Sequence, residues 1–293
     1  MMVVIVITTH RRNELLKRTL TSVKAADIPS EVEAIYILEN DTERTSDVIE
    51  DFPELPLVYR FFPEANKSRA LNWLLPELTG QHLIFLDDDV LIPPCLFTRY
   101  LDAFRKSEDN VAFWGGAVVP DFGSPPPEWL LKKLPRSVTG WNLGEQSILV
   151  RQPDFLGCNW AASADALRSV DGFDESRGPG ANTISVGQEY SAQRRLLDLG
   201  YLGMYVPGLP VRHFVPRDRC SPEWALARAE KNGRGFGLSY ASRLGTWIYW
   251  PALLQFWWAK VRCPTNANPN KEEDFLRMYE VRRWSGFVAG VRS

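Results

Sequence analysis

The stretch HLIFLDDD, residues 82–89, is an apolar run that ends abruptly in three carboxylates. Short apolar runs bounded by polar residues are typical of strands that are buried on both faces of a sheet. Three similar runs lie upstream, at residues 3–7, 33–38 and 57–61, and polar residues directly follow the first two. Open α/β sheets bind ligands at the carboxyl ends of their strands, so this pattern predicts a binding site there.

Segments with helical spacing lie between and after these strands. Residues 14–20 and 66–78 are predicted helices, and residues 190–199 form another that ends at Gly200. This alternation predicts an α/β fold with a doubly wound, mostly parallel central sheet and flanking helices. A further apolar run, residues 113–119, is followed by residues 120–144, whose prolines and glycines predict a long and mobile surface segment.

The triplet Asp87, Asp88 and Asp89 is the strongest chemical signal in the chain. Carboxylates crowded at the end of a buried strand repel one another and lose hydration, which is costly unless a cation compensates. Oxygen ligands suit Mg²⁺ or Mn²⁺, and these ions commonly link carboxylates to substrate phosphates. We therefore expect a metal site, with a solvent-facing acidic loop or a helix-capping cluster as the alternative.

The composition is that of a globular protein. The 293 residues are 45% hydrophobic and 24% charged, which argues against disordered, collagenous and disulfide-scaffold classes. Lysine and arginine total 34 against 36 acidic residues, so no overall positive charge favours nucleic acid as a partner. The charge is uneven, because residues 201–293 contain 14 basic and 7 acidic side chains and are also rich in tryptophan.

The cysteines and the N-terminal run indicate the compartment. Four widely spaced cysteines without a C-x-x-C pair argue against a zinc site and suit a reducing environment. The run at residues 1–7 has neither the basic flank nor the cleavage site of a signal peptide. No stretch reaches the ~18 apolar residues that a membrane-spanning helix needs. We expect a cytoplasmic protein.

A set of motifs in a fixed order carries a family resemblance. They are TTHRRNELL (8–16), LENDT (38–42), NKSRALN (66–72), FLDDD (85–89), GCNWAA (157–162), VDGFDE (170–175) and GQEY (187–190). Their order and spacing over residues 3–213 resemble glycosyltransferase family 2, whose members are inverting enzymes of GT-A (Rossmann-like) fold. The resemblance implies a nucleotide-diphosphate sugar as donor.

The resemblance also implies roles for individual residues. The positions expected to contact base or ribose are Thr8, Thr9, Glu39 and Asn40. Carboxylate and amide groups can form such contacts, although turn and capping chemistry would also account for Asn40. Further positions on the nucleotide-sugar side are Lys67, Asp87 and Asp88. Asp89 is expected to bind the metal.

Glu189 is the candidate catalytic base. An inverting transfer needs one carboxylate that accepts the proton of the attacking hydroxyl, and the motif retains a carboxylate at Glu189 but has Gln188 before it. A helix-start glutamate stabilised by the helix dipole is the alternative. His213 lies where similar family members carry a metal-binding histidine, although a structural histidine is equally compatible. Asn159 and Trp160 are expected to bind the acceptor.

Residues 246–262 carry four tryptophans and one tyrosine and end in basic residues. Amphipathic aromatic and basic side chains suit the headgroup level of a bilayer, so we expect peripheral contact with the inner membrane face, with a dimer interface or core packing as alternatives. Arg217, Arg219 and Lys231 precede this segment, and three glycines follow Lys231 at positions 233, 235 and 237. We expect this stretch either to form a lid over the diphosphate or to be a solvated basic surface.

The expected organisation is a nucleotide-sugar-binding half (1–119), an acceptor-binding and catalytic half (120–235) and a basic, aromatic helical extension (236–293). The expected function is metal-dependent, Mn²⁺- or Mg²⁺-assisted transfer of a sugar to a saccharide or lipid-linked saccharide in polysaccharide or glycolipid assembly. A nucleotidyltransferase is one alternative, but it would carry a glycine-rich phosphate loop, and residues 8–13 contain no glycine. A catalytically degenerate, nucleotide-sugar-binding partner subunit is the other.

Overall fold

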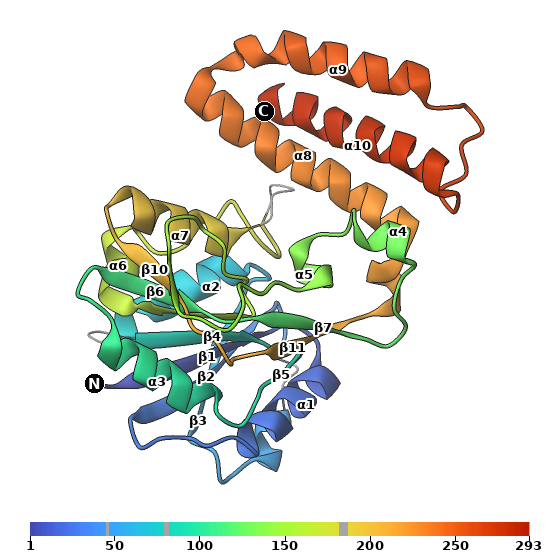
Figure 1. The fold of residues 1–293 in the computed structure, drawn as a ribbon. Coiled ribbons are helices and arrows are strands. Elements are labelled where there is room, and N and C mark those ends of the chain that lie inside the picture. Colours follow the sequence, from blue (N-terminus) through green and yellow to red (C-terminus); the bar gives the residue numbers. More distant parts are fainter. Residues whose placement is uncertain (45–46, 79–81, 182–186, 293) are drawn as a thin grey trace. The chain divides into compact units, whose positions relative to one another are not determined.

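A computed structural model describes residues 1–44, 47–78, 82–181 and 187–292, and these residues form two compact units. Unit 1 comprises residues 1–121, 140–181 and 187–214, and unit 2 comprises residues 122–139 and 215–292. The predicted functional division at residues 119 and 235 differs from these units, because residues 140–214 pack with the N-terminal part of the chain. Figure 1 colours the ribbon along the sequence.

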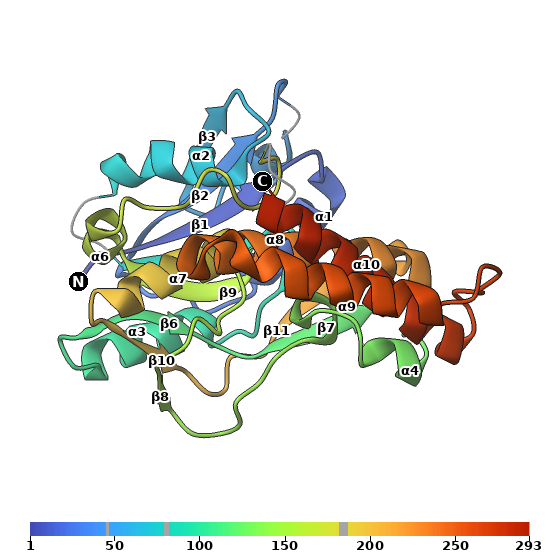
Figure 2. The same ribbon diagram turned by 90° about the horizontal axis from the view of Figure 1, so that it is seen from above.

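The main sheet of unit 1 contains eight strands among the described residues (Figures 1 and 2). Their order across the sheet is β3 (Leu57–Phe62), β2 (Val32–Asn40), β1 (Val3–Thr9), β4 (His82–Asp87), β9 (Asn159–Ser163), β6 (Val111–Gly115), β10 (Leu202–Tyr205) and β8 (Ile148–Val150). The strands β3, β2, β1 and β4 are parallel, and β10 is parallel to β6. The strands β9 and β8 run antiparallel to their neighbours. The predicted α/β class with a mostly parallel sheet is confirmed.

Helices cover both faces of this sheet, which explains its uninterrupted apolar strands. In β1, Val3, Ile5 and Ile7 belong to one core cluster and Val4 and Val6 to the other. The first cluster includes side chains of α1 (Asn13–Lys24) and α3 (Leu96–Lys106). The second includes side chains of α2 (Lys67–Leu74), α6 (Ala164–Ser169) and α7 (Gln188–Asp198). Alternate residues of one strand therefore point into different cores.

A second, three-stranded sheet has the order β5 (Val90–Leu91), β11 (Val211–Val215) and β7 (Val118–Phe122). The apolar run at residues 113–119 contributes to both sheets, because β6 ends at Gly115 in the main sheet and β7 begins at Val118 in the second. In β11, His213 pairs with Val90 of β5 in antiparallel register. This pairing brings the C-terminal part of unit 1 to the end of β4.

Unit 2 is helical. Its elements are α4 (Glu128–Leu131), α5 (Arg136–Thr139), η3 (Arg217–Cys220), α8 (Pro222–Leu244), η4 (Thr246–Ile248), α9 (Tyr249–Arg262) and α10 (Glu272–Arg292), while η1 (Val48–Asp51) and η2 (Leu75–Glu77) belong to unit 1. The prediction that residues 120–144 form only a surface segment is wrong, because Leu130 and Val138 are buried in one cluster with Phe275. Among the helices that could be searched, none has the length and apolar character needed to cross a bilayer.

Glycines allow α8 and α10 to pack at very short distance (Figure 1). A Cβ atom at Gly237 would lie 2.2 Å from the carbonyl oxygen of Phe287, and one at Gly286 would lie 2.0 Å from that of Glu230. Only glycine fits such a contact between two backbones. The lid predicted around Lys231 is therefore corrected: this stretch is the interior of α8, and its glycines serve helix packing.

Candidate active site at the carboxyl ends of the strands

The acidic triplet lies where the main sheet and the second sheet meet within unit 1. Asp87 ends β4, and Asp88 and Asp89 form the turn that leads into β5. Because β11 pairs with β5, His213 comes beside this turn, with its Nε2 3.3 Å from Oδ1 of Asp89. The backbone N–H of Phe214 donates to the carbonyl oxygen of Asp89 at 2.8 Å. Strand pairing therefore fixes the histidine relative to the acidic turn.

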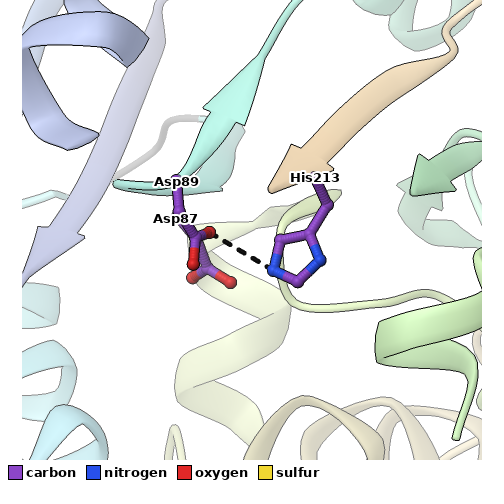
Figure 3. Close-up of side chains that lie close together, drawn as sticks. All are labelled: Asp87, Asp89 and His213. Carbon is purple, nitrogen blue, oxygen red and sulfur yellow. Dashed lines mark ion pairs between the residues drawn. The ribbon is translucent and has the colours of Figure 1, made fainter. Parts of the chain in front are cut away.

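Asp87, Asp89 and His213 point toward one another (Figure 3). One ligand atom of each lies within 4.8 Å of the others, and Asp89 and His213 are only 6% and 5% exposed. Two carboxylate oxygens and one imidazole nitrogen form a donor set that suits Mn²⁺, and the carboxylates also suit Mg²⁺. The residues present therefore fit a divalent cation.

Asp88 lies behind this cluster and is 2% exposed. Its Oδ2 accepts a hydrogen bond from Oγ1 of Thr9 at 2.8 Å, and its Oδ1 lies 3.1 Å from Nη1 of Arg12. Burial, and then the carboxylate of Asp89, raise the pKa of Asp88 to about 6 although Arg12 and Thr9 act in the opposite direction. The protein therefore compensates this negative charge only in part, which favours binding of an additional cation.

Arg12 is a site residue that the sequence analysis did not single out. Its Nη1 also lies 2.9 Å from Oδ2 of Asp89, so one guanidinium contacts two members of the triplet. Its sequence position offered a signal, because it lies in the loop after β1, which is parallel to β4 and adjacent to it. Loops that follow neighbouring parallel strands meet at the same edge of the sheet.

A small pocket beside the triplet contains the candidate base. Its lining includes Thr8, Lys67, Trp160 and Glu189. Lys67, the first residue of α2, donates to Oδ1 of Asp87 at 2.5 Å. Burial lowers the pKa of Lys67, but the carboxylates of Asp87 and Glu189 outweigh this effect and raise it, so the lysine stays charged. The ammonium group of Lys67 therefore interacts with both Asp87 and Glu189 at this pocket.

The position of Glu189 depends on the start of α7 and on a glycine opposite it. Gly187, with φ +90°, precedes the helix, and Glu189 is its second residue. A Cβ atom at Gly157 would lie 3.4 Å from Cδ of Glu189. The absence of a side chain at Gly157 leaves space next to the carboxylate, where an acceptor hydroxyl could approach.

The four predicted nucleoside positions lie together at the ends of β1 and β2. Thr8 and Thr9 pair with Leu38 and Glu39 in parallel register, and Asn40 follows. Glu39 is fully buried, and the hydroxyl of Tyr59 donates to its Oε2. Burial and this carboxylate raise the pKa of Tyr59, so the hydroxyl keeps its proton. The adjacent strands thus place the four residues in one largely buried cluster.

A second ion pair near this cluster was also missed by the sequence analysis. Arg11, in a left-handed conformation with φ 52°, donates from Nε to Oδ2 of Asp41 at 2.5 Å. This hydrogen bond lowers the pKa of Asp41 to about 2. The strained backbone of Arg11 therefore belongs to a charged contact that joins the loops after β1 and β2.

The two residues predicted to bind the acceptor have different surroundings. Trp160 borders the pocket, but it is only 2% exposed, and its ring stacks on Phe85 within the second core cluster. Asn159 is fully buried, and its Nδ2 donates to the carbonyl oxygens of Ala117 and Leu209, both at 2.9 Å. Its Oδ1 accepts from the hydroxyl of Tyr100 at 2.8 Å. Because both amide hydrogens are engaged in these contacts, Asn159 supports the backbone around the site, and the acceptor-binding prediction does not fit it.

Comparison with known proteins adds to this geometry. Residues 4–170 match the sequence profile described as glycosyl transferase family 2. The chain is 32% identical over 242 residues to the succinoglycan biosynthesis protein ExoM of Rhizobium meliloti (strain 1021). The match covers 80% of this chain and 74% of that protein.

Two solved structures resemble the chain over nearly its whole length. The mannosyltransferase PcManGT from Pyrobaculum calidifontis, in complex with GDP-Man and Mn²⁺, has a TM-score of 0.57 and 17% identity, and the likeness covers 99% of this chain and 84% of that one. The S. aureus protein TarS 1–349, in complex with UDP-GlcNAc, has a TM-score of 0.55 and 12% identity, with 100% and 91% covered. At these identities the likeness shows a common fold.

Proposed function

Because the chain belongs to glycosyltransferase family 2 and has the GT-A fold, we propose that it is a metal-dependent, inverting enzyme. It transfers a sugar from a nucleotide-diphosphate donor to a saccharide or lipid-linked saccharide acceptor. The observation that carries this proposal is the pocket in which Glu189 and Lys67 lie next to the acidic triplet.

Asp87, Asp89 and His213 are the proposed ligands of Mn²⁺ or Mg²⁺. The closeness of their ligand atoms and their burial support this assignment, as does the Mn²⁺ in the structurally similar mannosyltransferase. When bound, such a cation neutralises charge on the departing diphosphate. Asp88 supports the site from behind, and Arg12 holds Asp88 and Asp89 in place.

Donor binding is assigned to the polar cluster at the ends of β1 and β2. Thr8, Thr9, Glu39 and Asn40 contact the nucleoside, and the carboxylate of Glu39 accepts hydrogen bonds from the base or ribose. Tyr59 supports this role because its hydroxyl orients the buried carboxylate. Lys67 is placed to contact the sugar or the diphosphate from within the pocket.

Glu189 is the proposed catalytic base. It accepts the proton of the acceptor hydroxyl while that oxygen attacks the anomeric carbon from the face opposite the diphosphate. Its place in the pocket argues against a degenerate binding subunit, for which a displaced glutamate would be expected.

Polysaccharide assembly is the proposed context, since the relative ExoM is named for succinoglycan biosynthesis. We include peripheral contact with the cytoplasmic membrane face in the proposal. The large exposed side chains of α9 support it. A lipid-linked acceptor would then be reached at that surface.

The donor is tested first by calorimetry with UDP- and GDP-sugars, with and without Mn²⁺. Glu189→Gln should then keep donor affinity while kcat falls roughly 10²–10⁴-fold, because the amide cannot accept the proton. Glu108→Gln, at an exposed position outside the pocket, is the control. Proton NMR should show a β-linked product from an α-linked donor. Retention of configuration, or a near-normal kcat in Glu189→Gln, would overturn the mechanism.

A further inference from the structure

The helix α9 exposes its apolar face instead of burying it. Six large apolar side chains of η4 and α9 are between 51% and 82% exposed: Trp247, Trp250, Leu254, Trp257, Trp258 and Val261. They recur every three or four residues and so form one stripe along the helix, which we call the α9 stripe. The buried residues of the helix, Ala252 and Ala259, are small. An exposed apolar surface of this kind marks an interaction site.

Basic residues accompany the α9 stripe in the sequence, and the next acidic residues are Glu272, Glu273 and Asp274 in the first turn of α10. Residues 231–271 contain no aspartate or glutamate but six basic residues: Lys231, Arg234, Arg243, Lys260, Arg262 and Lys271. Nζ of Lys260 lies 5.0 Å from the ring centroid of Trp257, and Cζ of Arg262 lies 4.2 Å from that of Trp258. Tryptophan rings paired with basic side chains are typical of the headgroup level of a bilayer.

A groove of about 410 Å³ lies between α9 and α10, next to the stripe. Its lining includes three arginines, Arg262, Arg277 and Arg283, and the rings of Trp258 and Trp284. Glu280 also lines the groove, where it accepts a hydrogen bond from Arg283 at 2.7 Å. Arg277 lies 3.9 Å from carboxylate oxygens of Glu273 and of Asp274, so Arg262 contributes most of the positive charge that the groove offers. A guanidinium group of this kind suits a phosphate, which it binds in a forked geometry.

We propose that unit 2 docks on a bilayer of anionic phospholipid, with the α9 stripe in the interface and a headgroup phosphate in the arginine groove. This inference specifies the peripheral membrane contact included in the proposed function and rests on it. The 14 residues of α9 span about 21 Å, less than the ~30 Å hydrocarbon core, so the helix lies along the surface. Two copies that met through the α9 stripe would bring Lys260 and Arg262 of each close to their counterparts, whereas anionic headgroups complement these cations.

Co-sedimentation with vesicles tests the proposed membrane docking. The buffer contains EDTA and no sugar donor, so that catalysis does not influence the result. The purified full chain should bind vesicles of 70% phosphatidylcholine and 30% phosphatidylglycerol at least tenfold more tightly than pure phosphatidylcholine. Replacing Trp257 and Trp258 by serine should weaken binding roughly 100-fold, since two large apolar side chains are no longer buried. Trp73→Ser, an exposed tryptophan of α2, is the matched control and should bind like the wild type.

Further variants distinguish the contribution of the groove to vesicle binding from that of the α9 stripe. Arg262→Gln with Arg277→Gln should weaken binding to anionic vesicles roughly 30-fold and leave binding to neutral vesicles unchanged, at about 1 kcal/mol for each charge. Val261→Asp should weaken binding to both, and its 82% exposure means that the fold does not depend on it. Circular dichroism at increasing temperature confirms that each variant is folded.

Vesicle binding that is unchanged in the tryptophan variant would overturn the inference. So would a wild-type dimer that this variant converts to a monomer while lipid binding persists, as measured by light scattering after gel filtration. The inference and the enzymatic proposal fail separately. Intact vesicle binding without sugar transfer counts against the enzyme, and transfer to a soluble acceptor without vesicle binding counts against the membrane surface.

Discussion

Asp88 should make the metal-free protein less stable as the pH rises. The carboxyl is 2% exposed, and burial together with Asp89 raises its pKa to about 6 from an ordinary value of 3.8. The folded chain therefore binds more protons at this group than the unfolded chain between pH 3.8 and 6. Because the folded-state pKa is the higher one, this contribution to stability is complete below pH 3.8 and is lost as the pH rises through 6.

The magnitude follows from the two pKa values. A difference of about 2.2 units corresponds to about 3 kcal/mol over the whole range. Between pH 5 and pH 8 the expected loss is about 1.4 kcal/mol, because roughly nine-tenths of the folded molecules carry the proton at pH 5. Other carboxylates also titrate, so Asp88→Asn supplies the reference that lacks this group.

Urea unfolding of the wild type and of Asp88→Asn at pH 5 and pH 8, in EDTA, measures the effect. Between the two pH values the wild type should lose about 1.4 kcal/mol more than the variant. Asp109→Asn, an exposed aspartate, should follow the wild type. Equal losses in the wild type and in Asp88→Asn would refute the reasoning, because Asp88 would then be ionised in the fold at pH 5.

Two further changes test the site and unit 2. Asp89→Asn should abolish turnover and Mn²⁺-dependent donor binding in calorimetry while the melting temperature stays the same or rises, since repulsion within the triplet is relieved; unchanged activity would contradict the metal assignment. Gly237→Ala should destabilise the helix pair by about 1–3 kcal/mol, because its Cβ would lie 2.2 Å from a backbone oxygen of α10. The melting temperature of Gly237→Ala is compared with that of Lys231→Ala, a control at an exposed position of α8. Equal melting temperatures would contradict the importance of the close contact between α8 and α10.

The sequence by itself determined the elements of the sheet and the chemistry at its edge. Strands buried on both faces must be apolar throughout, so residues 3–7 and 82–86 were identified from their composition alone. The three carboxylates at the end of β4 could also be recognised from the sequence, because they directly follow its apolar run. The family resemblance singled out Glu189 and Lys67 separately, and the fold brings both to the lining of one pocket.

Tertiary structure alone decided which distant residues meet and which faces are covered. His213 reaches Asp89 because β11 pairs with β5, and such a pairing between remote segments has no local signal. The outward face of α9 and the short distance between α8 and α10 are decided in the same way. An apolar periodicity is identical whether a neighbouring helix buries the stripe or leaves it exposed, and a glycine in sequence does not show whether it bends a loop or admits another backbone.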